Sequence, residues 1–316
     1  MLRFLTRRLV LFPFILLFAN LFGYLFAFLN APVVLTNNPY SRGNLEVPPV
    51  LPEYLNYLKG TVQGNFGTTF TGEGVLTAIS RVGIASLGLI GIALALSIVI
   101  GIMLGRLAVR RNRVGVSTWL TFLSTIGLAL PSFYIAMLLI TFLLLILLYA
   151  IPGGTTIIPF QGFGWDAHLI LPVLALTIQP AAKIAQVTGS LLSEEMEKPY
   201  ITASLSFGHS FKTLKSKFAF RSVLAPILLT IAASLRMMIA ELIIIERLFN
   251  WPGIGRLIAS TLSIGARSQD ILSPPLIAAL LTVLVALFLF IDLLATSISR
   301  IMDPRLRVES EALPSQ

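Results

Sequence analysis

Long apolar stretches without charge alternate with short charged segments along this chain. A bilayer core about 30 Å thick needs about 20 apolar residues of helix, so each long stretch predicts one membrane-spanning helix. The predicted spans are residues 9–29, 82–105, 117–149, 169–191, 222–245 and 276–299. The pattern therefore predicts an all-α, polytopic membrane protein with six transmembrane helices.

The third predicted span is unusually long. Residues 114–165 carry no charge, and Pro131 divides the run. Two spans here would move the later segment that carries Lys198, Lys212 and Lys215 to the outer side, against the tendency of basic residues to stay inside. We therefore predict one long helix over residues 117–149, bent near Leu130 and Pro131.

The distribution of basic residues predicts the orientation of the spans. With the N-terminus inside, 15 of the 23 Lys and Arg residues fall in cytoplasmic segments, which favours both termini in the cytoplasm. Arg3, Arg7 and Arg8 could instead begin a signal peptide, but the apolar run that follows exceeds the usual 7–15 residues of a signal core. We predict an uncleaved first helix.

Composition supports a membrane protein over a soluble one. Of the 316 residues, 56% are hydrophobic and 12% are charged, against about 25% charged in soluble domains. The net charge of +9 would suggest nucleic acid as a partner of a soluble protein, but here the basic residues cluster between apolar runs. The lipid bilayer is the expected partner and nucleic acid is not. There is no cysteine, hence no disulfide and no thiol nucleophile.

The sequence offers no catalytic centre of its own. It contains no G-x-x-x-x-G-K-[ST] phosphate loop and no H-E-x-x-H motif. Its two histidines, His168 and His209, fall on opposite sides of the membrane in the predicted topology. We expect no catalytic residue, no metal site and no cofactor on this chain; a membrane channel or an intramembrane enzyme is a less favoured alternative.

Several polar residues fall inside predicted spans, where desolvation makes them functional candidates. Arg236 is the foremost candidate for lining a pathway because it lies in the middle of its span. The other candidates are Gln179, Gln186 and Glu241. A structural alternative is that Lys183 extends to the membrane surface and that Arg236, Glu241 and Asp292 neutralise one another.

Two segments between spans are longer than plain connections. The outer segment, residues 31–81, holds the acidic and aromatic run E-Y-L-N-Y and predicts either a small cap or a passive loop. The inner segment, residues 193–221, has helix-forming stretches on both sides of Gly208, acidic at first and then basic and amphipathic. Such a segment is typical of a helix at the membrane surface or in a partner's groove.

The inner segment reads P-Y-I-T-A-S-L-S-F-G at residues 199–208, and Pro226 follows eighteen residues after Gly208. Residues 246–257 read E-R-L-F-N-W-P-G-I-G-R-L, and residues 303–307 read D-P-R-L-R. Together with N-F-G-T-T-F at residues 65–70, these runs resemble the permease subunits of bacterial ABC importers, in the dipeptide, oligopeptide and nickel subfamily. Leu205 and Phe207 stand where that family usually has basic residues, and Gly189 stands where it has arginine.

The resemblance implies a type I ABC-importer permease fold in the bacterial inner membrane. It implies ATP-driven import of peptides or a related small solute, with nickel or another non-peptide solute as the alternative. The implied partners are a second permease subunit, two ATP-binding-cassette ATPase subunits that bind ATP and Mg²⁺, and an extracytoplasmic solute-binding protein.

The resemblance also implies that the inner segment forms a coupling helix that docks on the ATPase. Small residues there would let the backbone approach a groove closely, and Phe207 would anchor it. The expected coupling residues are Tyr200, Ala203, Ser204, Phe207 and Gly208. The expected organisation is residues 1–30 for the N-terminal segment and first span, 31–81 for the outer segment, 82–305 for the permease core with the coupling loop 193–221, and 306–316 for a cytoplasmic tail.

Overall fold

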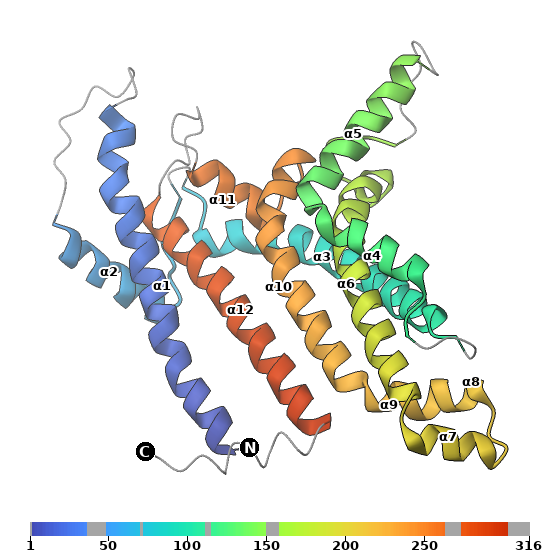
Figure 1. The fold of residues 1–316 in the computed structure, drawn as a ribbon. Coiled ribbons are helices and arrows are strands. Elements are labelled where there is room, and N and C mark those ends of the chain that lie inside the picture. Colours follow the sequence, from blue (N-terminus) through green and yellow to red (C-terminus); the bar gives the residue numbers. More distant parts are fainter. Residues whose placement is uncertain are drawn as a thin grey trace. The chain divides into compact units, whose positions relative to one another are not determined.

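The computed structural model describes residues 2–36, 49–69, 72–110, 115–149, 158–262 and 273–302. The regular structure in these ranges is helical, apart from one isolated bridge between Thr68 and Gly74. The helices are α1 (Leu2–Thr36), α2 (Val50–Val62), α3 (Val75–Ala108), α4 (Thr118–Ala129), α5 (Ser132–Tyr149), α6 (Ile170–Met196), α7 (Pro199–Ser206), α8 (Phe211–Thr213), α9 (Phe220–Ser222), α10 (Leu224–Leu248), α11 (Ile254–Leu262) and α12 (Pro274–Met302) (Figure 1). A 3₁₀ turn, Ala167–Leu169, precedes α6, and a π-helix, Leu214–Ala219, joins α8 to α9.

Among the described residues, six helices are long and apolar enough to cross a bilayer, which confirms the predicted all-α fold with six spans. They are Arg8–Asn30, Val75–Ala108, Ser132–Tyr149, Ala167–Met196, Leu224–Leu248 and Pro274–Ile298. The second begins earlier than its charge-free run. Arg81 lies within it, is 70% exposed and pairs with Glu73 at 3.0 Å.

The prediction of one bent helix over residues 117–149 was wrong. The chain forms two helices, α4 and α5, interrupted at Leu130, which is extended (φ −102°, ψ 115°). The residue before a proline is sterically disfavoured in the helical region, and Pro131 has no N–H to donate. With 18 residues α5 is long enough to be the third span, whereas α4, with 12, is too short.

The chain forms two compact units, and the first comprises Met1–Leu87 with Asn250–Phe290. Here α2, from the predicted outer segment, packs against α1. The ring centroids of Tyr54 and Tyr57 lie 5.1 and 5.2 Å from that of Tyr24, and Asn20 Nδ2 donates to the Tyr57 hydroxyl at 3.2 Å. The outer segment is therefore a packed amphipathic helix over part of its length, not only a loop.

The N-W-P-G run forms a tight turn ahead of α11 in the same unit. Trp251 is fully buried, and its Nε1 donates to the Ala85 carbonyl of α3 at 3.1 Å. Ile254 N donates to Ser86 Oγ at 2.7 Å, and Asn250 takes the left-handed conformation (φ 56°) that the turn requires. This run, one of those that carry the sequence resemblance, thus fixes the turn before α11 to α3.

The second unit comprises Gly88–Phe249 with Ile291–Gln316, and α6 is its central helix. It packs against α4, α5 and α10 and is the most buried of the six spans. Small residues allow the closest approaches: a Cβ on Gly101 would lie 2.7 Å from Ile184 Cβ, and one on Gly105 would lie 2.6 Å from Thr188 Cβ. Two glycines one turn apart therefore let α3 touch the backbone of α6.

We expect Gly105→Val to destabilise the second unit. The Cβ of the introduced valine would lie 2.6 Å from Thr188 Cβ and 2.7 Å from the Ala185 carbonyl oxygen. Overpacking of this kind costs about 1–3 kcal/mol of stability. Thermal unfolding of the purified chain in detergent measures the loss. The matched control is Gly91→Val in the same helix, where a Cβ has nothing within 4 Å. Equal unfolding temperatures for the two variants would contradict the close packing.

Candidate coupling site and polar residues of the spans

The inner segment folds as a helical hairpin between two spanning helices. Helix α7 follows the end of α6, the chain turns at Gly208, and α8 with the π-helix returns to α10 (Figure 1). The start of α7 is set by Lys198, which is extended (ψ 146°), and by Pro199 at the first helical position. The start of α8 is capped by Ser210, whose Oγ accepts from Thr213 N at 3.2 Å.

Gly208 ends α7 for a backbone reason. Its φ of +87° lies in the left-handed region, its N–H donates to the Leu205 carbonyl at 3.0 Å, and His209 N donates to the Ser204 carbonyl at 3.2 Å. A Cβ at Gly208 would have nothing within 4 Å. The turn itself therefore calls for glycine, a requirement separate from the predicted need for a small side chain against a partner.

One side of α7 is fixed to the unit by apolar packing. Ile201 is fully buried in a cluster with Leu192 of α6, Leu214 of the π-helix and Ile227 of α10, and Leu205 packs against the same cluster. Because residues 201 and 205 are one turn apart, they define a single inward face. The hairpin is thus joined to the C-terminal end of α6 and the N-terminal end of α10.

The opposite side of α7 is open. Thr202, Ala203, Ser206 and Phe207 are exposed, and their spacing places them on one helical face. Phe207 is 85% exposed, a large apolar side chain that packs little against the described part of the chain. Of the predicted coupling residues, Ala203, Phe207 and Gly208 lie in the open, whereas Ser204 is half-buried and donates to the Tyr200 carbonyl at 2.8 Å.

Tyr200 and Glu195 form a hydrogen-bonded network at the root of α7. The Tyr200 hydroxyl donates to Glu195 Oε1 at 2.8 Å, and Lys198 Nζ lies 2.5 Å from Glu195 Oε2. Burial of the ring, reinforced by the Glu195 carboxylate, raises the pKa of Tyr200, so its hydroxyl stays protonated and donates. Sequence reasoning assigned Glu195 only to an acidic stretch; its contact with Tyr200 across Pro199 depends on the turn between the helices.

Two predicted polar residues of the spans make contacts within the second unit. Arg236 of α10 pairs with Asp292 of α12 at 2.9 Å, so these two charges neutralise each other as the structural alternative anticipated. Glu241 instead accepts a hydrogen bond from the Ser132 hydroxyl at the start of α5. Sequence reasoning missed Ser132, and its only local signal is its position directly after Pro131.

The other predicted pathway residues lie on one face of α6. Gln179 and Gln186 are seven residues apart, with Lys183 between them, which is the repeat of a single helical face. Gln179 is 7% exposed, and its Oε1 has no hydrogen-bond partner among the described residues. Gln186 and Lys183 are half-buried. The D-P-R-L-R run and the predicted tail 306–316 lie outside the described residues.

The structure therefore defines a multi-pass α-helical membrane protein with an anchored hairpin between two of its spans. The chain belongs to the family of the binding-protein-dependent transport system inner membrane component, which matches residues 97–308. That range covers the hairpin, α6 and α10. The family resemblance read from the sequence is confirmed.

Curated relatives agree with this assignment. The chain is 30% identical over 268 residues to a probable peptide ABC transporter permease protein of Sinorhizobium fredii, which covers 82% of this chain and 81% of the relative. It is 30% identical to the dipeptide transport system permease protein DppB of Lactococcus lactis, with 82% of each covered. It is 29% identical to the oligopeptide transport system permease protein AppB of Bacillus subtilis, with 81% of each covered.

A solved structure shares the fold. A chain of the MetNI methionine ABC transporter, in an inward-facing conformation, aligns with a TM-score of 0.55 and 18% identity, over 72% of this chain and 97% of that one. At this identity the likeness concerns the fold alone.

Proposed function

We propose that this chain is a permease subunit of an ATP-driven importer of peptides and that α7 is its docking element for the ATPase. The observation that carries the proposal is the exposed face of α7, with Phe207 at its end, on a helix whose other face is fixed by Ile201. The names of the curated relatives support peptides as the cargo.

The packing suggests how the hairpin transmits force. A docking helix attached only through flexible loops would move independently of the spans. In contrast, α7 shares a close-packed cluster with the ends of α6 and α10. Close-packed interiors transmit displacement because they are hard to compress. Closure of an ATPase pair would therefore tilt α6 and α10 together with α7, and open the pathway toward the outer side.

The proposed complex contains a second permease subunit, two cassette ATPases that bind ATP and Mg²⁺, and an extracytoplasmic solute-binding protein, in the bacterial cytoplasmic membrane. This chain contributes half of the pathway and performs no covalent step. The test is uptake of labelled peptides by the complex purified from its own cells and reconstituted in vesicles. We expect ATP-dependent accumulation of di- or oligopeptide; accumulation of Ni²⁺ without peptide would support the alternative cargo.

The charge distribution predicts that both termini are cytoplasmic. The chain has no cysteine, so single cysteines can be introduced at Ser310 and at Ser41, both outside the described residues. In intact cells, an impermeant thiol reagent should label Ser41→Cys and should not label Ser310→Cys, because segments rich in Lys and Arg stay on the cytoplasmic side. Labelling of Ser310→Cys from outside would contradict the orientation.

Arg236 provides a test of the pathway. Arg236→Gln removes this ion pair from Asp292, and a charged acid inside a span costs at least about 2.5 kcal/mol. The double variant Arg236→Gln with Asp292→Asn removes that cost. If Arg236 lines the pathway, we expect peptide uptake to fall about tenfold, the effect of losing about 1.4 kcal/mol, in both variants, with the ATPases still bound. Recovery of uptake in the double variant would assign Arg236 to charge neutralisation alone.

A further inference from the structure

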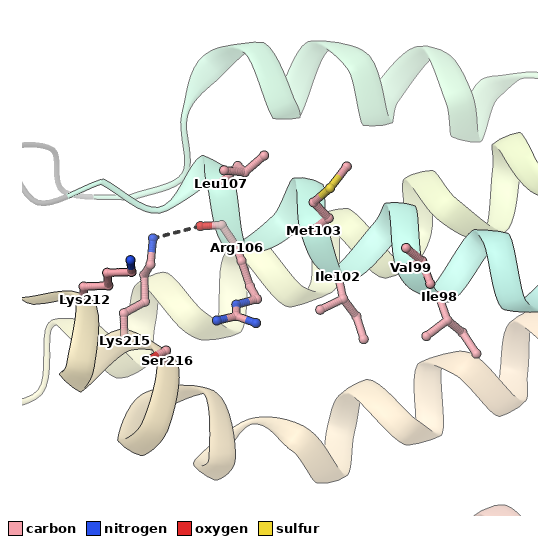
Figure 2. Close-up of a pocket in the computed structure, with 9 residues that line it drawn as sticks. All are labelled: Ile98, Val99, Ile102, Met103, Arg106, Leu107, Lys212, Lys215 and Ser216. Atoms are coloured by element: carbon pink, nitrogen blue, oxygen red, sulfur yellow. Dashed lines mark hydrogen bonds between the residues drawn. The ribbon is translucent and has the colours of Figure 1, made fainter.

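A second feature of the inner side is a pocket separate from the open face of α7. It has a volume of about 640 Å³ and lies between the inner half of α3 and the segment formed by α8 and the π-helix (Figure 2). This volume falls within the range of small-molecule sites, about 300–1,000 Å³. The proposed coupling role does not use this pocket.

Apart from Leu107, the lining of the pocket is divided by polarity along α3. Ile98, Ile102 and Met103 form its apolar wall, within the charge-free run of α3 that ends at Gly105. Arg106, Lys212 and Lys215 gather at the other end, where α3 approaches its C-terminus (Figure 2). The pocket is therefore amphipathic along the direction of the span, apolar toward the membrane interior and basic toward the membrane surface.

Contacts within the chain position two of the basic side chains at this end, Lys215 and Arg106. Lys215 Nζ donates to the Arg106 carbonyl at 3.1 Å and to the Val109 carbonyl at 3.0 Å, which caps the last turn of α3. The Arg106 guanidinium lies 4.9 Å from the centroid of the Phe220 ring. Burial, with Arg106 nearby, lowers the pKa of Lys215, so an anion at this end would favour its charged form.

No acidic residue lines the pocket, and among the described residues neither Arg106 nor Lys212 has an ion-pair partner. Three cations without an acid make the basic end of the pocket electropositive. The π-helix is an independent indication of a functional site, because such helices are rare and occur frequently at functional sites. Its residues Lys215 and Ser216 both face the pocket.

We propose that this pocket is a binding site for an anionic phospholipid of the inner leaflet. The phosphate lies between Arg106, Lys212 and Lys215, and an acyl chain lies along Ile102 and Met103. An amphipathic ligand fits because headgroup and chain match the two ends of the pocket, and basic pockets beside spanning helices on the cytoplasmic side are suited to anionic headgroups. A water-soluble anion would leave the apolar wall uncovered.

The test measures lipid binding to the purified full-length chain. The chain in neutral detergent is titrated with phosphatidylglycerol or with phosphatidylcholine, and bound lipid is counted by native mass spectrometry. We expect tighter binding of phosphatidylglycerol. Lys212→Ala should weaken that binding about fivefold, the contribution of one basic residue at an anionic surface, and leave phosphatidylcholine binding unchanged.

The matched control is Lys217→Ala, an exposed lysine of the adjoining π-helix that does not line the pocket. It removes the same charge and should leave phosphatidylglycerol affinity at the wild-type value. Met103→Trp, which fills the apolar wall, should weaken binding of both lipids. Because Lys212 and Met103 are exposed, both variants should fold.

Two results would overturn the proposal. One is an equal loss of phosphatidylglycerol affinity in Lys212→Ala and Lys217→Ala, which would indicate a general effect of charge. The other is unchanged lipid binding in Lys212→Ala together with loss of a co-purifying protein subunit, which would make the pocket a protein interface. Neither outcome depends on peptide uptake, so the proposed function is tested separately.

Discussion

Phe207→Asp is expected to abolish ATP-coupled transport while the chain still inserts and folds. Phe207 is 85% exposed and packs little against the described residues, so its loss removes little from the fold. If it occupies a groove on the ATPase, an aspartate there places a charge in an apolar contact. Anchors of this kind contribute about 2 kcal/mol or more, which corresponds to roughly thirtyfold weaker association.

The measurement is the amount of ATPase that co-purifies with the permease, together with peptide-stimulated ATP hydrolysis by the purified complex. The matched control is Thr213→Asp, which adds the same charge to the same hairpin. An acid is favourable there because residue 213 lies in the first turn of α8, where Ser210 caps the helix. Wild-type ATPase recovery and hydrolysis in Phe207→Asp would mean that α7 is not the docking element.

Trp251→Ala is expected to have the largest effect on stability. Trp251 is fully buried and its indole N–H donates to the Ala85 carbonyl of α3, so truncation leaves a cavity and removes this hydrogen bond. Buried tryptophan-to-alanine changes cost about 3–5 kcal/mol. We expect a large fall in unfolding temperature in detergent and poor recovery of the folded chain from membranes.

Two other substitutions separate the causes. Trp251→Phe keeps most of the buried ring and loses the hydrogen bond, so we expect a smaller cost of about 1–3 kcal/mol. Trp119→Ala removes a tryptophan of α4 that is 37% exposed and should lower the unfolding temperature less than Trp251→Ala does. If Trp119→Ala destabilises the chain as much as Trp251→Ala does, the turn after α10 is not a special anchor.

The number of spans could be predicted from the sequence because the signal is physical and local. Charge is costly inside a bilayer, so charge-free runs of sufficient length mark the spans without knowledge of the packing. The same reasoning failed at residues 117–149, where the absence of charge could not distinguish a bent helix from two helices. Leu130, placed before a proline, adopts an extended conformation, and the local steric effect decides the outcome.

The candidate site was predictable in position but not in detail. The family resemblance identified the segment around α7, yet only the fold shows that Ile201 points inward and that Phe207 is open. The contacts of Glu241 with Ser132 and of Lys215 with the end of α3 join residues more than a hundred positions apart. Such pairs depend on tertiary packing, which a single sequence does not encode in any local pattern.

The most direct test of the central claim is a cross-link between α7 and the cassette ATPase. The chain has no cysteine, so Phe207→Cys provides a single thiol on the exposed face, and Lys217→Cys provides one elsewhere on the same hairpin. The reagent is bifunctional, joins a thiol to an amine and is applied to native membranes. It should link Phe207→Cys to the ATPase, with a yield that changes when ATP binds. The control, Lys217→Cys, should give little cross-linked product. Absence of an ATPase adduct from Phe207→Cys in an actively transporting complex would contradict the docking of α7.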